Sequence, residues 1–221
     1  EVAIKSVGFG ATGGSPRKRE RVTLHVWMEL ELLLAAQSHP SICELLDVVV
    51  TSQHQVGLVL PWYGQSLHDI LQEQAYEDDL PLDFGVFAAA FAGLMDALRH
   101  MHARSIVHAD IKPANIPVPT PASTATAATA KFVFCDFGCG FLMEPGCHPR
   151  WSRAQILKED KGVELCTLFW RAPELLFGLA DFSVAIDVWS LGVNMAEVAG
   201  RNPGRNKPRF DGALNEENRR L

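Results

Sequence analysis

The sequence lacks the features that would direct it to a membrane or to nucleic acid. None of its 221 residues lies in an apolar run of the ~18 residues that a membrane-spanning helix needs. The opening residues 1–5 resemble an interior strand rather than a signal peptide. Positive charge is not in excess, because 20 Lys and Arg stand against 26 Asp and Glu and leave a net charge of −6. We therefore expect neither a nucleic-acid nor a membrane partner.

Cysteine is sparse, and its spacing shows no pattern. The five cysteines are an odd number, and no two of them have C-x-x-C spacing. This argues against a disulfide framework and against a zinc site. It fits a reducing compartment, so we expect an intracellular protein of the cytoplasm or the nucleus.

The composition does support a folded core, because 48% of the residues are hydrophobic and 21% are charged. Three prolines between positions 117 and 121 predict a disordered surface insert over about 117–130. A strand-rich first quarter before a helix-rich remainder predicts an α+β fold with two unequal lobes. Apolar spacing predicts helices over 23–36, 83–103 and 187–199, and strands over 1–5, 45–50, 55–60 and 131–135.

Four short strings occur along the chain in an order that points to a particular chemistry. Each string alone is weak evidence. They are Val2-Ala3-Ile4-Lys5, His108-Ala109-Asp110-Ile111-Lys112-Pro113-Ala114-Asn115, Asp136-Phe137-Gly138 and Ala172-Pro173-Glu174. Together they resemble the signature set of the protein kinases. Residues 167–176 and 185–192 make the sequence look closest to the cyclin-dependent-kinase branch of the Ser/Thr kinases.

The resemblance covers nearly the whole chain and implies a bilobal protein-kinase-like fold of the α+β class. Residues 1–60 would be a partial small lobe, residues 61–66 the hinge, and residues 67–221 a partial large lobe. The chain begins at the strand that bears Lys5. We therefore expect a domain truncated at both ends, with the Gly-rich phosphate loop before the first residue and the closing helices after the last.

The resemblance further implies a Ser/Thr protein kinase that transfers the γ-phosphate of ATP to a protein hydroxyl, with Mg²⁺ as cofactor. Asp110 would orient the substrate hydroxyl or accept its proton. Lys112 would neutralise charge that develops on the γ-phosphate. Thr167 would hydrogen-bond near both of them, and it marks a Ser/Thr kinase. Asn115 and Asp136 would supply the oxygen ligands of Mg²⁺.

Nucleotide binding is assigned to the small lobe and the hinge by the same resemblance. Lys5 would hold the α- and β-phosphates, and it needs a carboxylate to fix it. Glu29 is the better candidate for that carboxylate because apolar residues follow it at +1, +3 and +4, but Glu31 stays a rival. Adenine would be contacted by Ala3, Leu60, the carbonyl of Pro61 and the backbone of Tyr63.

The D-F-G string occurs twice, and only one copy can be the metal-binding one. The second copy, at Asp136, follows an apolar strand and lies downstream of the Asp110 loop. The first copy, at Asp83, opens an amphipathic helix, where an N-cap role explains it. We therefore assign the metal to Asp136. Cys135, the preceding residue, is expected at the back of the nucleotide pocket.

Two functions from different classes are open at this point. The first is an active Ser/Thr kinase with a protein substrate and a cyclin-like or other regulatory subunit. The second is a catalytically weak pseudokinase that acts as a binding scaffold. Presence of the complete set of catalytic and metal residues favours the first. The helix over 23–36 does not carry the usual cyclin-contact sequence.

Regulation by phosphorylation of the activation segment is not expected. In the cyclin-dependent branch, three arginines clasp a phosphothreonine in that segment. The corresponding positions here hold Met28, Ala109 and Phe141, and the acceptor position holds Gly162. Without cations, a phosphate has nothing to bind. We therefore predict activity that does not depend on this modification.

Overall fold

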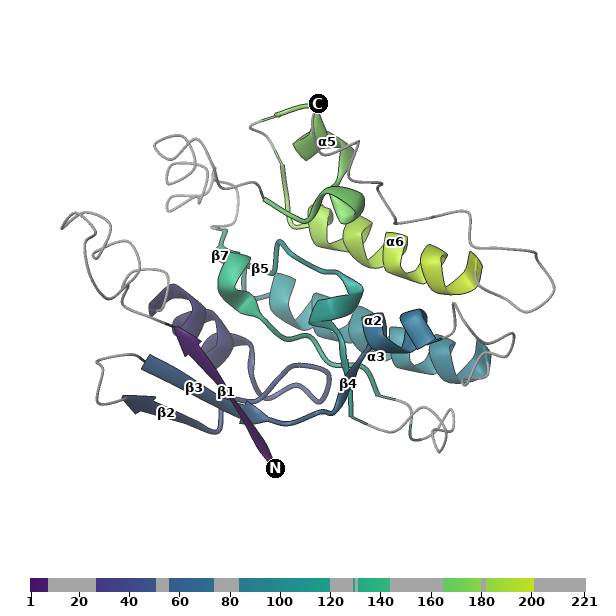
Figure 1. Cartoon of the computed structure of the whole chain (residues 1–221). Coiled ribbons are helices and arrows are strands. Elements are labelled where there is room, and N and C mark those ends of the chain that lie inside the picture. Colours follow the sequence, from purple (N-terminus) through teal and green to yellow (C-terminus); the bar gives the residue numbers. More distant parts are fainter. Residues whose placement is uncertain are drawn as a thin grey trace, which may run out of the picture.

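The computed structural model describes residues 1–7, 27–50, 56–73, 84–119, 129, 131–143, 165–179 and 182–200. A small antiparallel sheet lies at one side of the molecule and a larger helical part at the other (Figure 1). The sheet contains β1 (Val2–Val7), β2 (Asp47–Val50) and β3 (Val56–Pro61) in the order β1-β3-β2. This arrangement confirms the α+β class and the three N-terminal strands expected from the sequence.

The register of the sheet decides which side chains face inward. Lys5 pairs with Leu58, and Ala3 pairs with Leu60. Directly paired residues of antiparallel strands lie on one face, so these four side chains share a face. Leu58 is fully buried on it, whereas Ile4 on the opposite face is largely exposed.

Residues 27–36 form a helix beside the sheet (Figure 1). Its buried residues recur at helical spacing, and they are Glu29, Leu32, Leu33 and Ala36. Trp27 and Leu34 are exposed on its outer side. The sequence predicted this helix over 23–36, and residues 23–26 lie outside the described residues.

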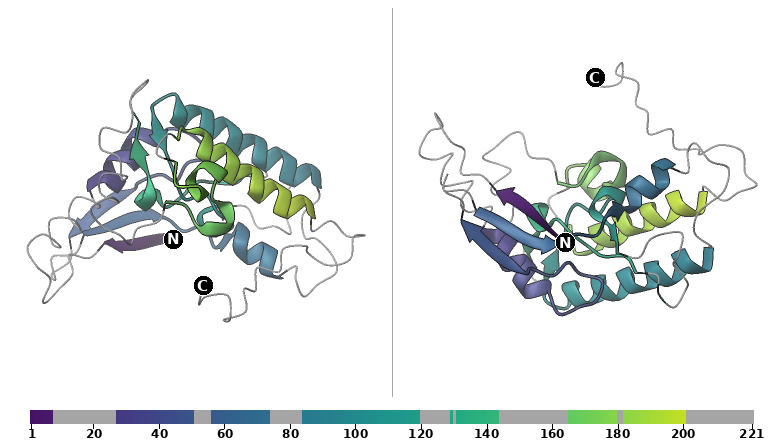
Figure 2. Two further views of the ribbon diagram at one scale, coloured as in Figure 1. Left: turned by 90° about the horizontal axis from the view of Figure 1, so that it is seen from above. Right: turned by 60° about the horizontal axis from the view of Figure 1, so that its bottom comes forward.

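The larger part is built on two long helices, α3 (Phe84–His102) and α6 (Ala185–Gly200), which lie side by side (Figure 2). The prediction of 83–103 for α3 is confirmed within one residue at each end. α6 begins two residues before the predicted 187. The short helices α2 (Leu67–Glu73) and α5 (Pro173–Leu176) were not predicted.

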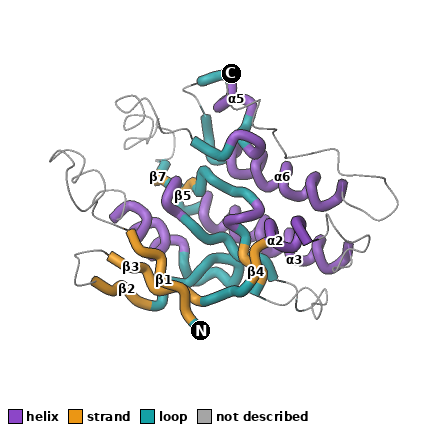
Figure 3. Tube along the Cα trace, in the orientation of Figure 1, coloured by secondary structure: helices purple, strands orange, loops and turns teal. Residues whose placement is uncertain are grey.

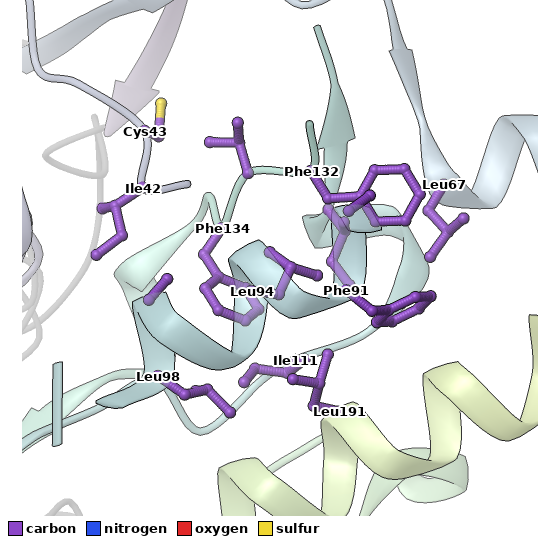
Figure 4. Close-up of a cluster of buried hydrophobic side chains, with 14 of the residues drawn as sticks. Ile42, Cys43, Leu67, Phe91, Leu94, Leu98, Ile111, Phe132, Phe134 and Leu191 are labelled. Carbon is purple, nitrogen blue, oxygen red and sulfur yellow. The ribbon is translucent and has the colours of Figure 1, made fainter. Parts of the chain in front are cut away.

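One main core connects the two parts of the molecule. Phe87 and Phe91 of α3 pack edge-on against Phe132, with ring centroids 5.9 and 5.4 Å apart. Leu32 and Leu33 of the helix at 27–36 belong to the same buried cluster. Figure 4 shows part of it, with side chains from α3, α6 and the segments around Ile42 and Phe134.

Two predictions about the middle of the chain are corrected by the structure. The strand expected over 131–135 is reduced to one parallel bridge, between Ile42 and Phe134. Pro117–Val118, expected in the disordered insert, forms the strand β6, which pairs with β4 (Gln65–Ser66). Proline is tolerated there because these contacts do not need its missing N–H. The N–H of Leu67 donates to the carbonyl of Ile116 at 2.8 Å beside the pair, and the carbonyl of Pro117 accepts from the N–H of Val133 at 3.1 Å. Residues 120–128 and 130 lie outside the described residues.

Between α3 and α6 the described chain is mostly loop, held by short pairings and turns (Figure 3). β5 (Ile106–Val107) pairs with β7 (Phe141–Leu142). Three 3₁₀ turns follow the same path, and they are η1 (Pro113–Asn115), η3 (Phe137–Cys139) and η4 (Leu168–Trp170). Within the described ranges, no helix has the length and apolar character needed to cross a bilayer.

Candidate functional site

Lys5 lies at the centre of an ion-paired group formed by three separate parts of the chain. Its Nζ donates to Oε1 of Glu29 at 2.5 Å and to Oδ1 of Asp136 at 2.6 Å. Glu29 is only 6% exposed, whereas Glu31, two residues on, faces solvent. The structure therefore selects Glu29 over its rival as the partner of Lys5.

The charges of this group shift one another's pKa values. Burial alone would lower the pKa of Lys5, but the carboxylates of Glu29 and Asp136 outweigh it and raise this pKa above its ordinary value. Burial alone would raise the pKa of Asp136, but the ammonium of Lys5 and the N–H of Gly138 lower it. Both groups are thus held in their charged forms.

Asp136 opens the 3₁₀ turn η3 in a left-handed conformation, with φ of 66° and ψ of 73°. Its side chain accepts a hydrogen bond from the N–H of Gly138 at 3.2 Å. A Cβ added at Gly138 would lie 3.1 Å from Oδ1 of Asp136, 3.4 Å from Oε2 of Glu29 and 3.5 Å from Nζ of Lys5. Glycine therefore keeps space open among three charged groups.

A second group of polar side chains surrounds Asp110. Oδ1 accepts from Oγ1 of Thr167 at 2.7 Å and from its N–H at 3.1 Å. Oδ2 accepts from Nζ of Lys112 at 2.7 Å and from Nδ2 of Asn115 at 3.1 Å. Lys112 also donates to Oγ1 of Thr167 at 3.0 Å. All four residues were predicted from the sequence, and the structure brings them together.

These contacts keep Asp110 ionised. Burial acts to raise the pKa of this carboxyl, but hydrogen bonds from Lys112 and Thr167 lower it below its ordinary value. Asn115 donates a further bond from Nδ2 to the backbone carbonyl of Asp110 at 2.9 Å. The carboxylate is therefore fixed in orientation as well as in charge.

Hydrogen bonds to the backbone connect the group around Lys5 with the group around Asp110. The N–H of Cys135 donates to the carbonyl of Asn115 at 3.1 Å, one residue before Asp136. His108, two residues before Asp110, donates from Nε2 to the carbonyl of Cys135 at 3.0 Å. The segments that carry Asp110, Asn115 and Asp136 are thus joined directly.

Asp187 of α6 anchors the loop at Asp110, although no role was predicted for it from the sequence. Asp187 of α6 is 0% exposed, and it accepts the backbone N–H groups of His108 and Ala109, each at 2.9 Å. Its Oδ2 also lies 3.0 Å from Nε2 of His102. Ala109 has a φ of 59°, so the loop takes a left-handed turn at this point. In the sequence, Asp187 is the one charged residue among the otherwise apolar residues 185–189, and this was the available sign of a special role.

The predicted adenine-contacting residues lie at the end of β3, directly after it, and on the paired strand β1. Leu60 and Ala3 share the sheet face of Lys5, as the register requires. Pro61 ends β3, and Tyr63 packs against the main core. The next residue, Gly64, has a φ of +79°, a conformation that side-chain-bearing residues rarely adopt, and it lets the chain turn into β4.

Several other predicted positions can be placed. The rings of His108 and Phe137 lie 5.0 Å apart, and Leu33 and Leu45 pack in the core cluster that includes Phe137. The resemblance to the protein kinases also implies that these four residues form an apolar column between the lobes, and their packing agrees with it. Asp83 lies outside the described residues, so its proposed cap stays a prediction.

Arg171 is a further residue that sequence reasoning missed. Its Nε and Nη2 donate to the carbonyl of Cys166 at 3.2 and 2.9 Å. Cys166 has a φ of 61° and directly precedes Thr167. Arg171 therefore holds the turn from which Thr167 reaches Asp110.

Comparison with known sequences identifies similar proteins over most of the chain. The family described as protein kinase domain matches residues 2–218. Cyclin-dependent kinase G-1 of Oryza sativa subsp. indica is 28% identical over 203 residues, which cover 91% of this chain and 25% of that protein. Cell division control protein 2 homolog 2 of Trypanosoma brucei brucei is 31% identical over 169 residues, which cover 76% of this chain and 42% of that protein. The chain therefore spans less than half the length of these two relatives.

Two further similarities extend the comparison. Mitogen-activated protein kinase 7 of Arabidopsis thaliana is 29% identical over 225 residues, which cover 91% of this chain and 54% of that protein. Among solved structures, a chain in the crystal structure of the yeast RNA Pol II CTD kinase CTDK-1 complex aligns with a TM-score of 0.66. It is 22% identical, and the alignment covers 91% of this chain and 55% of that chain. At this identity the likeness shows the fold alone.

Proposed function

This chain belongs to the protein kinase domain family, and from that premise we propose that its site transfers the γ-phosphate of ATP to a Ser or Thr hydroxyl of a protein. The observation that carries the proposal is the meeting of two groups. Lys5 is ion-paired with Glu29 and Asp136, and Asp110 is bonded to Lys112, Thr167 and Asn115. Phosphoryl transfer requires mainly positioning and charge neutralisation from a protein, and these groups supply both.

Lys5 is the residue we assign to the α- and β-phosphates. Its raised pKa keeps the ammonium protonated, and Glu29 fixes its direction from the buried side. Ala3 and Leu60 lie on the same sheet face and would contact the adenine ring. The carbonyl of Pro61 and the backbone of Tyr63 would hold its polar edge.

Asn115 and Asp136 are the residues we assign to Mg²⁺. The fit rests on the donor set, because an amide and a carboxylate oxygen are hard donors, and this ion is usually held by few protein groups. The space that Gly138 leaves beside the Asp136 carboxylate agrees with it. When bound, the ion would neutralise charge on the phosphates. Among the described residues, no group of three or more His, Cys, Asp or Glu side chains could hold a metal.

Asp110 is the residue we assign to the substrate hydroxyl. Its lowered pKa keeps it able to accept a hydrogen bond, and Thr167 and Lys112 fix both oxygens in place. A positioned base of this kind contributes roughly 10²–10⁴-fold to the rate. Lys112, next to it, would neutralise the transferred phosphoryl group.

The second candidate function, a pseudokinase that acts only as a scaffold, uses the same fold without turnover. A scaffold needs neither the buried Lys5–Glu29 pair nor the Asp110 network. For partners, we propose a protein substrate and a cyclin-like or other regulatory subunit, which the name of the rice relative favours. The exposed Trp27 and Leu34 on the helix at 27–36 offer such a subunit an apolar surface.

The experiment that tests the proposal compares the two D-F-G copies in the full-length protein. Asp136→Asn should lower Mg²⁺-dependent phosphorylation of a Ser/Thr peptide library by roughly 10²-fold or more, because it removes a charged ligand. Asp83→Asn should leave the rate within about twofold and cost about 1 kcal/mol or less of stability, as loss of a helix cap does.

Two results would contradict the proposal. Equal loss of activity in both variants, at matched stability, would refute the choice of Asp136. A wild-type protein that folds and binds partners but transfers no phosphate would favour the scaffold.

A further inference from the structure

Two segments far apart in the sequence run in parallel beside the site. The N–H of Phe134 donates to the carbonyl of Ser41, and the N–H of Cys43 donates to the carbonyl of Phe134, each at 2.9 Å. These bonds make Ile42 and Phe134 a parallel bridge pair. The next position of the register therefore places Cys43 opposite Cys135.

The two cysteines share a face of this pairing. Side chains alternate along extended segments, so residues that follow a parallel bridge pair point to the same side as each other. Ile42, Cys43 and Phe134 all belong to the main core, and Cys135 packs against it. In Figure 4 the sulfur of Cys43 points in another direction than the side chain of Ile42. The Sγ of Cys43 donates to the carbonyl of Glu44 at 3.9 Å. The neighbouring Cys135 thiol lowers the pKa of Cys43.

The spacing suits a covalent bond between the two sulfurs. Neighbouring strands lie about 4.7–4.9 Å apart, and the Cα atoms of disulfide-bonded cysteines lie about 4.4–6.8 Å apart. Both thiols are free in the structure. The separation expected for the paired segments therefore falls within the range that a disulfide spans.

Access to the pair favours a small oxidant. Cys43 is 1% exposed, whereas Cys135 is partly exposed. Cys135 directly precedes Asp136, which belongs to the group around Lys5. Hydrogen peroxide is small enough to reach a sulfur that larger disulfide oxidants cannot contact.

We propose that Cys43 and Cys135 form an oxidation-sensitive dithiol, which hydrogen peroxide closes into an intramolecular disulfide beside the nucleotide site. One thiol of the pair attacks the peroxide as a thiolate, so that an S–O bond forms, the O–O bond breaks and hydroxide leaves. The sulfur of the other cysteine then attacks the sulfenic acid, the S–S bond forms and the second oxygen leaves as water. The two thiol protons end in the two water molecules, and the two electrons reduce the peroxide. This inference goes beyond the proposed function and does not depend on turnover.

The test maps disulfides in the purified full chain. Reduced protein is treated with hydrogen peroxide, remaining thiols are blocked with N-ethylmaleimide, and peptides are identified by mass spectrometry without reduction. We expect a peptide that joins Cys43 to Cys135 as the main cross-linked product. Treatment with dithiothreitol should return both thiols.

Matched variants make the result specific. Cys43→Ser should abolish the cross-link, whereas Cys166→Ser, which changes another buried free thiol, should leave it intact. If circular dichroism shows that Cys43→Ser does not fold, Cys135→Ala takes its place. Recovery of Cys43 and Cys135 as blocked thiols or as separate sulfinic acids, in folded protein, would overturn the proposal. So would a dominant bond from Cys135 to Cys139.

Discussion

At Glu29 the chain buries a carboxylate that is only 6% exposed, and the ammonium of Lys5 makes this burial tolerable. An isolated buried charge is very costly, and pairing and hydrogen bonding offset much of that cost. Lys5 in turn reaches Asp136, so Glu29 sets the position of a charge that serves the rest of the site. The role of Glu29 is therefore one of positioning.

The first prediction compares the two rival carboxylates. Glu29→Gln should lower kcat/KM by about tenfold or more, because a hydrogen bond to a charged group contributes about 1.5–3 kcal/mol. Glu31→Gln changes an exposed residue two positions on and should alter kcat/KM by less than about twofold. Steady-state kinetics on the full-length protein, with ATP varied, measures both.

The reverse ranking, at equal melting temperatures, would show that Lys5 is held by Glu31. Sequence spacing alone could not decide which glutamate pairs with Lys5. Both glutamates lie on the same predicted helix, and they differ in burial, which only the structure shows. Lys5, Asp110 and Asp136 were predictable because each lies in a string with several fixed neighbours. Asp187 was not, since its value depends on backbone N–H groups that approach from a distant loop.

On the scale of elements, α6 acts as a base for the loop that carries Asp110. The buried carboxylate of Asp187 accepts two backbone N–H groups from this loop and also meets His102 at the end of α3. One side chain therefore joins two helices and a loop. Buried acceptors with several donors of this kind stabilise a fold strongly.

The second prediction concerns Asp187→Asn. An amide keeps the shape but presents its NH₂ to one of the backbone N–H groups, which leaves a buried donor unpaired. We expect a loss of about 2–4 kcal/mol of stability, measured as a shift in the guanidinium unfolding midpoint with an unchanged m-value. Asp96→Asn on α3 removes an exposed carboxylate that also meets a histidine, His39, and should shift the midpoint far less. Equal shifts would contradict the anchoring role.

Helices were more predictable than the segments between them. α3 matches its predicted bounds closely because apolar residues repeat at helical spacing over five turns. The expected strand at 131–135 failed for a different reason. Its apolar residues suit a strand, but its backbone bonds go to three separate segments, at Ser41, Asn115 and Pro117, rather than to one partner strand. Such irregular pairing leaves no periodic trace in a sequence.

On the scale of the whole molecule, uncharged side chains occupy the three positions where arginines would bind a phosphorylated activation segment. Phe141 is 1% exposed and packs edge-on against Phe182, with ring centroids 5.9 Å apart. Ala109 is fully buried, with its N–H directed at Asp187. Met28 is partly exposed on the helix at 27–36. The segment that would carry the phosphate, at Gly162, lies outside the described residues.

The third prediction follows from this packing. Activity of the full-length protein should be unchanged, within about twofold, after exhaustive phosphatase treatment, because no charge-assisted bonds of about 1.5–3 kcal/mol each are available from these three positions. Phosphosites mapped by mass spectrometry before and after treatment provide the control. A large fall in rate that follows loss of phosphate from residues 142–166 would contradict it.

The contact between Asp187 and the Asp110 loop also sets an order of events in folding. His108 and Asp187 are 79 residues apart in the chain. Closing so long a separation costs entropy before any bond is made, and distant contacts of this kind form slowly. During synthesis the loop leaves the ribosome well before α6 exists to hold it. The residues assigned to chemistry therefore take their final arrangement late, after most of the surrounding core has been made.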